Sequence, residues 1–248
     1  ANVMFNIMRG GVFVENNTIH SADFIKFVTT RNTNEVEAAK KVCSKDTFSY
    51  KELGAAVKAT GDDQLYRLYL EYLPLSFSRR HGDPSRPWNK FNIMLNDKEG
   101  NPILNYEGNW RDIFQNWEAL AMSYPSYTTG MISKFVNATS CDGFNPYRIT
   151  RSGLDWEVPE PENPWSNIGY WNDHQIIYLS KLLELQNQLD PEALNSLLNK
   201  PLFTTANIPY HIKSYADIEK NPRSTIAFNY DLNDKIEADQ KKYGTDAK

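Results

Sequence analysis

Apolar residues recur at the spacing of α-helices in several separate stretches of this 248-residue chain. The clearest stretch places Leu65, Leu68, Tyr69 and Tyr72 on one side of a helix that Pro74 must end. The predicted helices cover residues 21–28, 35–42, 49–60, 62–73, 111–123, 126–138 and 167–185, with another from about residue 191. Because few stretches alternate as strands do, the predicted fold class is mostly α.

Short polar residues stand where three of these helices begin. Ser21, either Asp62 or Asp63, and Asp190 are the expected capping residues. Such side chains accept hydrogen bonds from the free backbone N–H groups of a first helical turn. These residues therefore predict where the three helices start.

The predicted helix at residues 167–185 carries apolar residues nearly all round its axis, including Ile176, Ile177, Leu179 and Leu182. A helix that is apolar on every side is usually buried on every side, so we expect an inner helix surrounded by others. Helical hairpins closed into a barrel have such inner helices, and their polar mouths hold the site. The predicted architecture is an (α/α) barrel, or toroid, of helical hairpins.

Two long irregular stretches interrupt the helices, at residues 75–108 and 141–164, and both are rich in proline and charged residues. Long polar loops within a compact domain are often functional. The first contains Arg79 and His81, whose charges suit an anion. Arginines near prolines also brace loops by donating to carbonyl groups, so both interpretations stay open.

The composition narrows the classes of partner and cofactor. A net charge of −4 and a pI near 5.7 argue against a dedicated nucleic-acid binder. No apolar run is long enough to cross a bilayer, so no membrane span is predicted. Cys43 and Cys141 are too few for a disulfide framework, which fits the cytoplasm. The four histidines are scattered and no phosphate loop occurs, so neither a metal nor a cofactor is predicted.

The ends of the chain carry two further expectations. Ala1 opens into an apolar run without an initiator methionine or a basic signal-peptide start, so we expect a piece of a longer polypeptide. Residues 1–248 are predicted to form a single α/α-toroid-like domain or a fragment of one, with residues 235–248 as a flexible charged tail.

Residues 106–118 concentrate side chains that suit a sugar: two tryptophans, three carboxylates, an arginine, two asparagines and a glutamine. Aromatic faces stack on the C–H faces of a sugar while its hydroxyl groups pair with polar side chains. All six tryptophans of the chain lie between residues 88 and 171. The expected sugar contacts among them are Trp110, Trp117, Trp156 and Trp171.

Asp112 admits two interpretations. The order Asp112-Ile-Phe-Gln115 is that of a helix-capping box, which would make the aspartate structural. A carboxylic acid at a helix start beside two indoles would also have a raised pKa and stay protonated, as a general acid for glycosidic cleavage must. Both interpretations remain open on the residues alone.

Two other acidic groups are candidates. Asp155 and Glu157 flank Trp156 in the second irregular stretch, a place suited to polar contact with a ligand. Asp173 and His174 stand in the first turn of the helix predicted at residues 167–185. There the aspartate could complement the helix dipole and the histidine be a satisfied polar group, or both could project into the mouth of the barrel.

Three segments taken together resemble the six-hairpin glycosidases, whose fold is an (α/α)6 barrel. They read Glu107-Gly-Asn-Trp-Arg-Asp-Ile-Phe-Gln-Asn-Trp117, Phe144-Asn-Pro-Tyr-Arg-Ile-Thr150 and Gly169-Tyr-Trp-Asn-Asp-His-Gln175. The resemblance is nearest to large uncharacterised bacterial members, and more distant to trehalases and processing glucosidases. It spans roughly residues 75–185. Because a full barrel needs more chain than this one has, part of a barrel or a reduced barrel is expected.

The resemblance implies that Asp112 is the general acid and that Trp110, Trp171 and Asp173 line a sugar site. We therefore predict a protein that hydrolyses a glycosidic bond of an oligosaccharide or polysaccharide, with Glu157 or Asp155 activating the water. One alternative is a phosphorylase, in which Arg79, Arg80 and His81 hold the phosphate. The others are a non-catalytic carbohydrate-binding or scaffold module, and loops whose tryptophans merely close a helical core.

Overall fold

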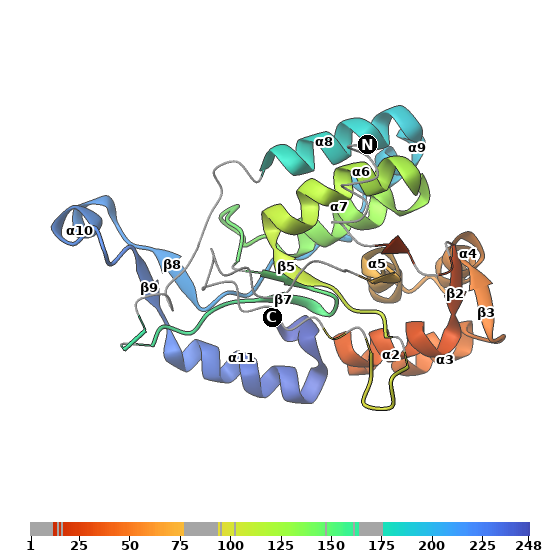
Figure 1. Ribbon diagram of the computed structural model, residues 1–248, viewed down its shortest axis with the longest axis horizontal. Helices are drawn as coiled ribbons and strands as arrows, with labels where there is room; N and C mark the ends of the chain where they lie inside the picture. The colour runs from red at the N-terminus through yellow and green to blue at the C-terminus, as the bar shows by residue number, and fades with distance from the viewer. Residues whose placement is uncertain are drawn as a thin grey trace.

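The chain is mostly helical with several small sheets, as its apolar pattern predicted (Figure 1). A computed structural model describes residues 12–13, 15, 17–76, 94, 96–101, 103–146, 148–160, 162–163 and 176–248. The side chains of Val12, Arg111 and Asp112 lie outside this description. Among the described residues, no helix has both the length and the apolar character that a membrane crossing requires.

Every predicted helical stretch overlaps an observed helix. The α-helices are α2 (Ser21–Arg31), α3 (Val36–Val42), α4 (Tyr50–Ala59), α5 (Asp63–Glu71), α6 (Asn116–Ser123), α7 (Thr128–Asn137), α8 (Ile176–Leu189), α9 (Pro191–Leu198), α10 (Tyr215–Lys220) and α11 (Tyr230–Tyr243). Short 3-10 helices are η1 (Thr33–Glu35), η3 (Pro125–Tyr127) and η4 (Thr245–Ala247), and η2 (Arg111–Gln115) is a π-helix.

The strands are two or three residues long and pair in antiparallel fashion. They are β1 (Val12–Phe13), β2 (Thr18–His20), β3 (Thr47–Ser49), β4 (Leu75–Ser76), β5 (Glu107–Asn109), β6 (Arg148–Thr150), β7 (Gly153–Asp155), β8 (Tyr210–Ile212) and β9 (Ile226–Phe228). β1 pairs with β4, β2 with β3 and β8 with β9, while β6 lies between β5 and β7.

The N-terminal part of the fold packs α2–α5 beside the β2–β3 pair. The Asp62 carboxylate accepts hydrogen bonds from the backbone N–H groups of Gln64 and Leu65, so of the two predicted capping residues, Asp62 and Asp63, the first caps α5. Apolar residues of α4 and α5, such as Leu53 and Leu68, are fully buried between the helices. Burying each such side chain stabilises the fold by roughly 1.5–3 kcal/mol.

The β5–β6–β7 sheet occupies the middle of the molecule in Figure 1, with α6–α9 above it and α2 and α11 below. Above the sheet, α7 packs against α5 and α8, and α8 packs against α9. One continuous aromatic-rich core runs through these layers, and its largest fully buried side chains include Trp110, Trp117, Tyr106 and Phe114.

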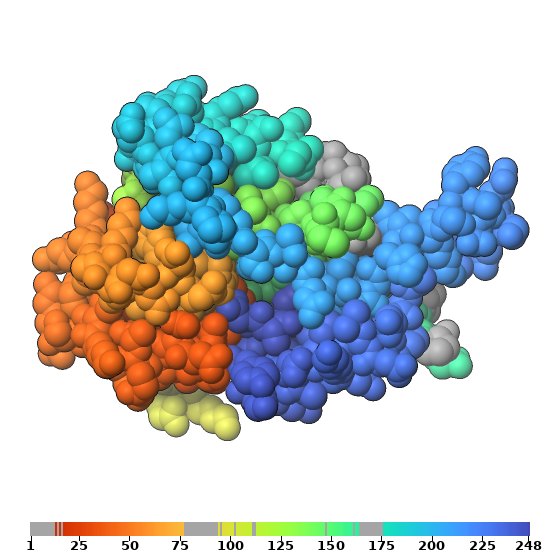
Figure 2. Space-filling model, turned by 180° about the vertical axis from the view of Figure 1, so that it is seen from behind, coloured from red at the N-terminus to blue at the C-terminus, as the bar shows by residue number. Residues whose placement is uncertain are grey.

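The C-terminal part begins with an arm formed by β8, α10 and β9, which protrudes from the body in Figures 1 and 2. The chain then returns along α11 and ends in η4, which contacts α2. Residues 235–248 are therefore folded onto the body and do not form the flexible tail that their charge suggested. The charged residues lie on the outer face of α11, whereas its inner face buries Asn233 and Ile236.

Two details differ from the sequence prediction. The N-cap of α2 is His20, and Ser21 is the first helical residue, because its hydroxyl group donates instead to the Lys45 carbonyl 2.5 Å away. The exposed fractions of Ile176 and Ile177 are 56% and 52%, so α8 is not buried on all sides. It buries one face, through Tyr178, Leu182 and Gln186.

Gly244 allows the sharp turn between α11 and η4, and we expect Gly244→Ala to destabilise the fold strongly. Its φ is +101°, and a Cβ atom there would lie 2.4 Å from the Arg31 carbonyl oxygen. We expect a loss of about 3 kcal/mol in the free energy of unfolding. Gly61→Ala is the matched control, since Gly61 also has a positive φ (+69°) but open space around it. That change should cost about 1–2 kcal/mol, and equal losses in urea unfolding would contradict the steric explanation.

Candidate functional site

One edge of the β5–β6–β7 sheet brings together segments that the sequence singled out separately. Asn109, Arg148 and Asp155 occupy one row across the three strands. Because β5 and β7 run in the same direction, the chain leaves both strands at this edge, while β6 enters there. Asp112 follows β5 by three residues and Glu157 follows β7 by two. The backbone of the candidate acid and the two other candidate carboxylates therefore approach the same edge.

The π-helix η2 begins immediately at this edge. Its first residue is Arg111 and its N-cap is Trp110, so Asp112 lies inside the helix and not at its cap. The capping-box interpretation of Asp112 is therefore wrong. Single turns of π-helix are rare and often mark functional positions, because the extra residue redirects the side chains around it. The side chain of Asp112 itself lies outside the described residues.

Trp110 and Trp117 lie in the core. Both are at most 1% exposed, and Trp110 meets the ring of Phe135 edge-on at 4.7 Å between centroids. Trp117 meets Phe114 edge-on at 5.2 Å. Within the described part of the chain their indole nitrogens have no hydrogen-bond partner. These two rings fill the core in this structure and present no open face to a sugar.

Asp155 is held between two cations. Its carboxylate accepts from Arg148 and forms an ion pair with Lys248, and Arg148 also donates to Glu107 at 2.9 Å. Burial alone would raise the pKa of Asp155, but the charges of Lys248 and Arg148 outweigh it and hold that pKa below its ordinary value. Asp155 is therefore ionised and weakly basic. Its neighbour Glu157 is partly buried and close enough for its charge to favour the protonated form of Arg148.

Trp156 is fixed by α11 and by the last residue of the chain. Its indole N–H donates to Asn233 at 2.9 Å, and the Lys248 ammonium group lies 4.6 Å from the ring centre. A cation in this position covers one face of the ring. Trp156 thus anchors the segment that carries Glu157.

The remaining predicted site residues, Trp171, Asp173, His174, Arg79 and His81, lie outside the described residues. The next described residue is Ile176, the first residue of α8, and α8 packs against η2. A cavity of about 510 Å³ lies beside the first turn of α8. Its walls are mainly apolar and include Phe135, Leu179 and Phe203. Asn145, which lies in the segment that leads into β6, also lines this cavity.

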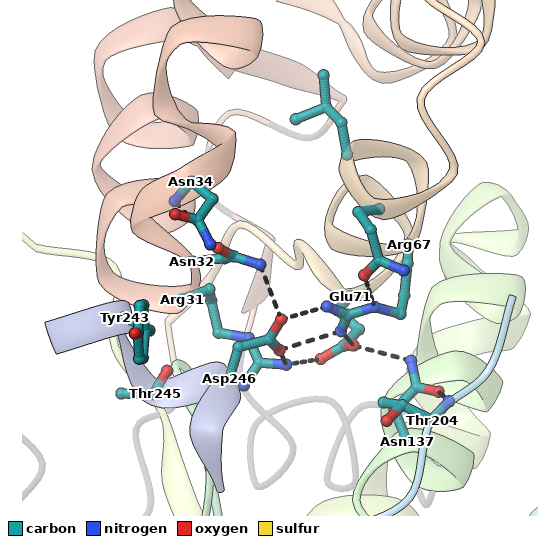
Figure 3. A network of polar contacts seen from close by, with 12 residues as sticks. Arg31, Asn32, Asn34, Arg67, Glu71, Asn137, Thr204, Tyr243, Thr245 and Asp246 are labelled. Carbon is teal, nitrogen blue, oxygen red and sulfur yellow. Dashed lines mark hydrogen bonds and ion pairs between the residues drawn. The ribbon is translucent and has the colours of Figure 1, made fainter. Parts of the chain in front are cut away.

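A buried network of charges was not predicted from the sequence (Figure 3). Glu71, in α5, accepts from Arg31 at 2.7 Å and from Arg67 at 2.9 Å, and Asp246 forms ion pairs with the same two arginines. The Arg67 and Glu71 side chains are 4% and 2% exposed. Their spacing of four residues on the buried side of an amphipathic helix was the available signal, since charges there must be paired.

The network joins distant parts of the chain. Asn137, in α7, donates to Glu71 at 2.8 Å and accepts from the backbone N–H of Thr204 at 3.0 Å, as Figure 3 shows. Burial would raise the pKa of Asp246, but Arg31 and Arg67 outweigh that effect and hold it below its ordinary value. The ion pairs and hydrogen bonds of the network tie α2 and α5 to α7 and to the C-terminal segment.

Comparison with known families relates part of the chain to the glycoside hydrolases. Residues 13–74 match a family model described as glycoside hydrolase family 149 insertion domain 1. The matched segment runs from β1 through α5, so it contains Arg31, Arg67 and Glu71 but not the β5–β6–β7 sheet. Among curated proteins, none matches the chain. The similarity thus relates residues 13–74 to an insertion domain of a glycoside hydrolase family and says nothing of a barrel.

Proposed function

We propose that the chain is a carbohydrate-active part of a glycoside hydrolase and that it hydrolyses a glycosidic bond of an oligosaccharide or polysaccharide. The observation that carries this proposal is the sheet edge from which the chain leaves both β5, into η2, and β7, toward Glu157. Asp112 acts as the general acid that protonates the leaving oxygen. Glu157 acts as the second carboxylate and activates the attacking water.

Glu157 is a better second carboxylate than Asp155. A general base must accept a proton near neutral pH, and Asp155 is kept weakly basic by Lys248 and Arg148. Asp155 instead orients Arg148, whose guanidinium group also bonds Glu107. An inverting reaction requires about 6.5–9.5 Å between the carboxyl groups of Asp112 and Glu157, and a retaining one about 5–5.5 Å.

We also propose that the helices α4–α9 form part of an (α/α) barrel. Consecutive helices pack together, as α4 does on α5, α7 on α8 and α8 on α9, and alternate helices pack as well, α5 on α7 and α6 on α8. Helical hairpins in a toroid make contacts of both kinds, between consecutive helices and between alternate ones. The exposed Ile176 and Ile177 side chains place α8 at a surface of this chain, where a neighbouring hairpin of a larger barrel would cover them.

Product release from α- and β-linked oligosaccharides tests the proposed reaction. Asp112→Asn and Glu157→Gln should each lower kcat by about 10²–10⁴-fold. Glu160→Gln, an exposed site three residues further on, should leave it unchanged. Turnover retained by Asp112→Asn would overturn the assignment of the acid. Turnover that depends on added phosphate would instead identify a phosphorylase.

A second candidate function is a non-catalytic carbohydrate-binding or scaffold module. One observation favours it: the matched family segment is an insertion domain. Oligosaccharide binding by the wild-type chain without any product release would support this second function. Calorimetry with the same panel of sugars distinguishes the two candidates.

A further inference from the structure

A second cavity lies at the seam between the segment matched to the insertion domain and the rest of the chain. We call it the seam cavity. Its volume is about 520 Å³, and its walls come from α4 and α5 on one side and from α7, α8 and α9 on the other. Figure 2 shows this face, with α4 and α5 in orange beside α9 in light blue. This volume is in the range that holds a small metabolite.

The helix α4 shapes the cavity through its residue spacing. Lys51 and Lys58 each lie three or four residues from Gly54 and Ala55, so the four residues form one stripe along the helix. The two small residues leave a hollow between two long cationic side chains. The Tyr69 hydroxyl group closes the floor of this hollow, since a Cβ atom on Gly54 would lie only 2.5 Å from it.

The opposite walls supply polar groups, and α5 supplies two aromatic rings. Gln186 is 3% exposed, and its side chain accepts from the Thr129 hydroxyl group and donates to the Asp190 carbonyl. The Asp190 carboxylate is engaged as the N-cap of α9, where it accepts from the backbone N–H of Ala193 at 3.0 Å. Tyr66 and Tyr69 stack with their ring centres 6.1 Å apart. The walls are thus held in place by bonds within the protein.

The lining of the seam cavity carries two lysines, Lys51 and Lys58, against one carboxylate, that of Asp190, so its charge is locally positive in a protein whose net charge is −4. Within the described part of the chain, neither Lys51 nor Lys58 forms an ion pair. A third ammonium group, that of Lys200, lies 5.6 Å from the Tyr66 ring centre, and that of Lys58 lies 5.2 Å from it. Cations gathered without carboxylate partners repel one another, and an anion between them removes that repulsion.

We propose that the seam cavity binds a small phosphate-bearing molecule of the size of a sugar phosphate. Lys51 and Lys58 hold the phosphate from either side of Gly54 and Ala55, because ammonium groups are strong partners for phosphate oxygens. The edges of Tyr66 and Tyr69 and the Gln186 side chain contact the remainder of the ligand. A neutral sugar would leave the lysine charges unneutralised, so we expect it to bind more weakly.

Isothermal titration with glucose 6-phosphate, inorganic phosphate and glucose tests the proposal. We expect glucose 6-phosphate to bind more tightly than inorganic phosphate, and glucose to bind more weakly than either. Lys51→Gln/Lys58→Gln should weaken the binding of glucose 6-phosphate at least tenfold. Both lysines are exposed, so the double variant should fold. The matched control is Lys40→Gln/Lys41→Gln, which removes the same charge from the exposed side of α3 and should change nothing.

Two further variants separate this site from the proposed glycosidic reaction. Ala55→Phe fills the hollow from an exposed position and should abolish binding of glucose 6-phosphate. Asp112→Asn should leave that binding intact, whatever it does to sugar cleavage. Absence of heat with both phosphate ligands would overturn the proposal, as would unchanged affinity in the double lysine variant. Equal affinity for glucose and glucose 6-phosphate would overturn the role given to the lysines.

Discussion

Glu71→Gln is expected to lower the free energy of unfolding by about 3–5 kcal/mol, because it breaks a buried network of ion pairs. The Glu71 carboxylate accepts hydrogen bonds from Arg31, Arg67 and Asn137. A glutamine of the same shape has one oxygen fewer, and its NH₂ group faces cations that are already donors. Asp246 would then be the remaining carboxylate beside two guanidinium groups.

Urea unfolding of the wild type and the variant measures this effect. Glu118→Gln is the matched control, since Glu118 pairs with Lys181 at 3.0 Å but its side chain is 38% exposed. An exposed pair contributes about 0–1 kcal/mol. Similar losses in the two variants would show that burial does not govern the strength of the network.

Lys134→Met is expected to remove a pH dependence of stability that the wild type has between pH 7 and 10. Lys134 lies in α7, is 1% exposed, and donates to the Arg151 carbonyl at 2.9 Å. Burial, reinforced by the charge of Arg31, lowers its pKa to about 7, although the Glu71 carboxylate opposes that shift. The ring of Tyr106 lies 5.6 Å from the ammonium group.

The sign follows from proton binding. Between pH 7 and the ordinary lysine pKa near 10.4, the unfolded chain binds this proton and the folded chain does not, so stability rises with pH. From pH 7 to 9.5 the wild type should therefore gain roughly 3 kcal/mol relative to Lys134→Met. Urea unfolding at both pH values measures the difference. Lys41→Met, at an exposed site of α3, should follow the wild type, and parallel behaviour of all three proteins would contradict the prediction.

The starts and ends of helices were predictable because they depend on residues that are close together in the sequence. Asp62 caps α5 as its position indicated, and Pro74 lies just beyond the end of that helix. The extent of burial was not predictable in the same way. Ile176 and Ile177 are apolar, yet their exposure depends on which neighbours the chain supplies, and the spacing of residues within one helix does not contain that information.

The candidate site was predicted in part for the same reason. Residue type identified the segments around Asp112 and Asp155 separately, and the register of β5–β6–β7 brings them to one edge. Aromatic content alone did not distinguish a sugar platform from a core residue, and Trp110 and Trp117 are core residues here. The ion pair between Asp155 and Lys248 was not predicted, because the two residues lie 93 positions apart in the sequence.

The buried charge network also has a consequence for the order in which the protein folds. Asp246 is 179 positions after Arg67, so the second carboxylate leaves the ribosome long after the arginines it neutralises. At about 5–20 residues per second, that delay is roughly 10–35 s. Until then, Arg31 and Arg67 share Glu71 alone, and desolvating them is unfavourable. We therefore expect residues 13–74, although they match the model of an insertion domain, to reach their final packing only after Asp246 has been synthesised and has docked.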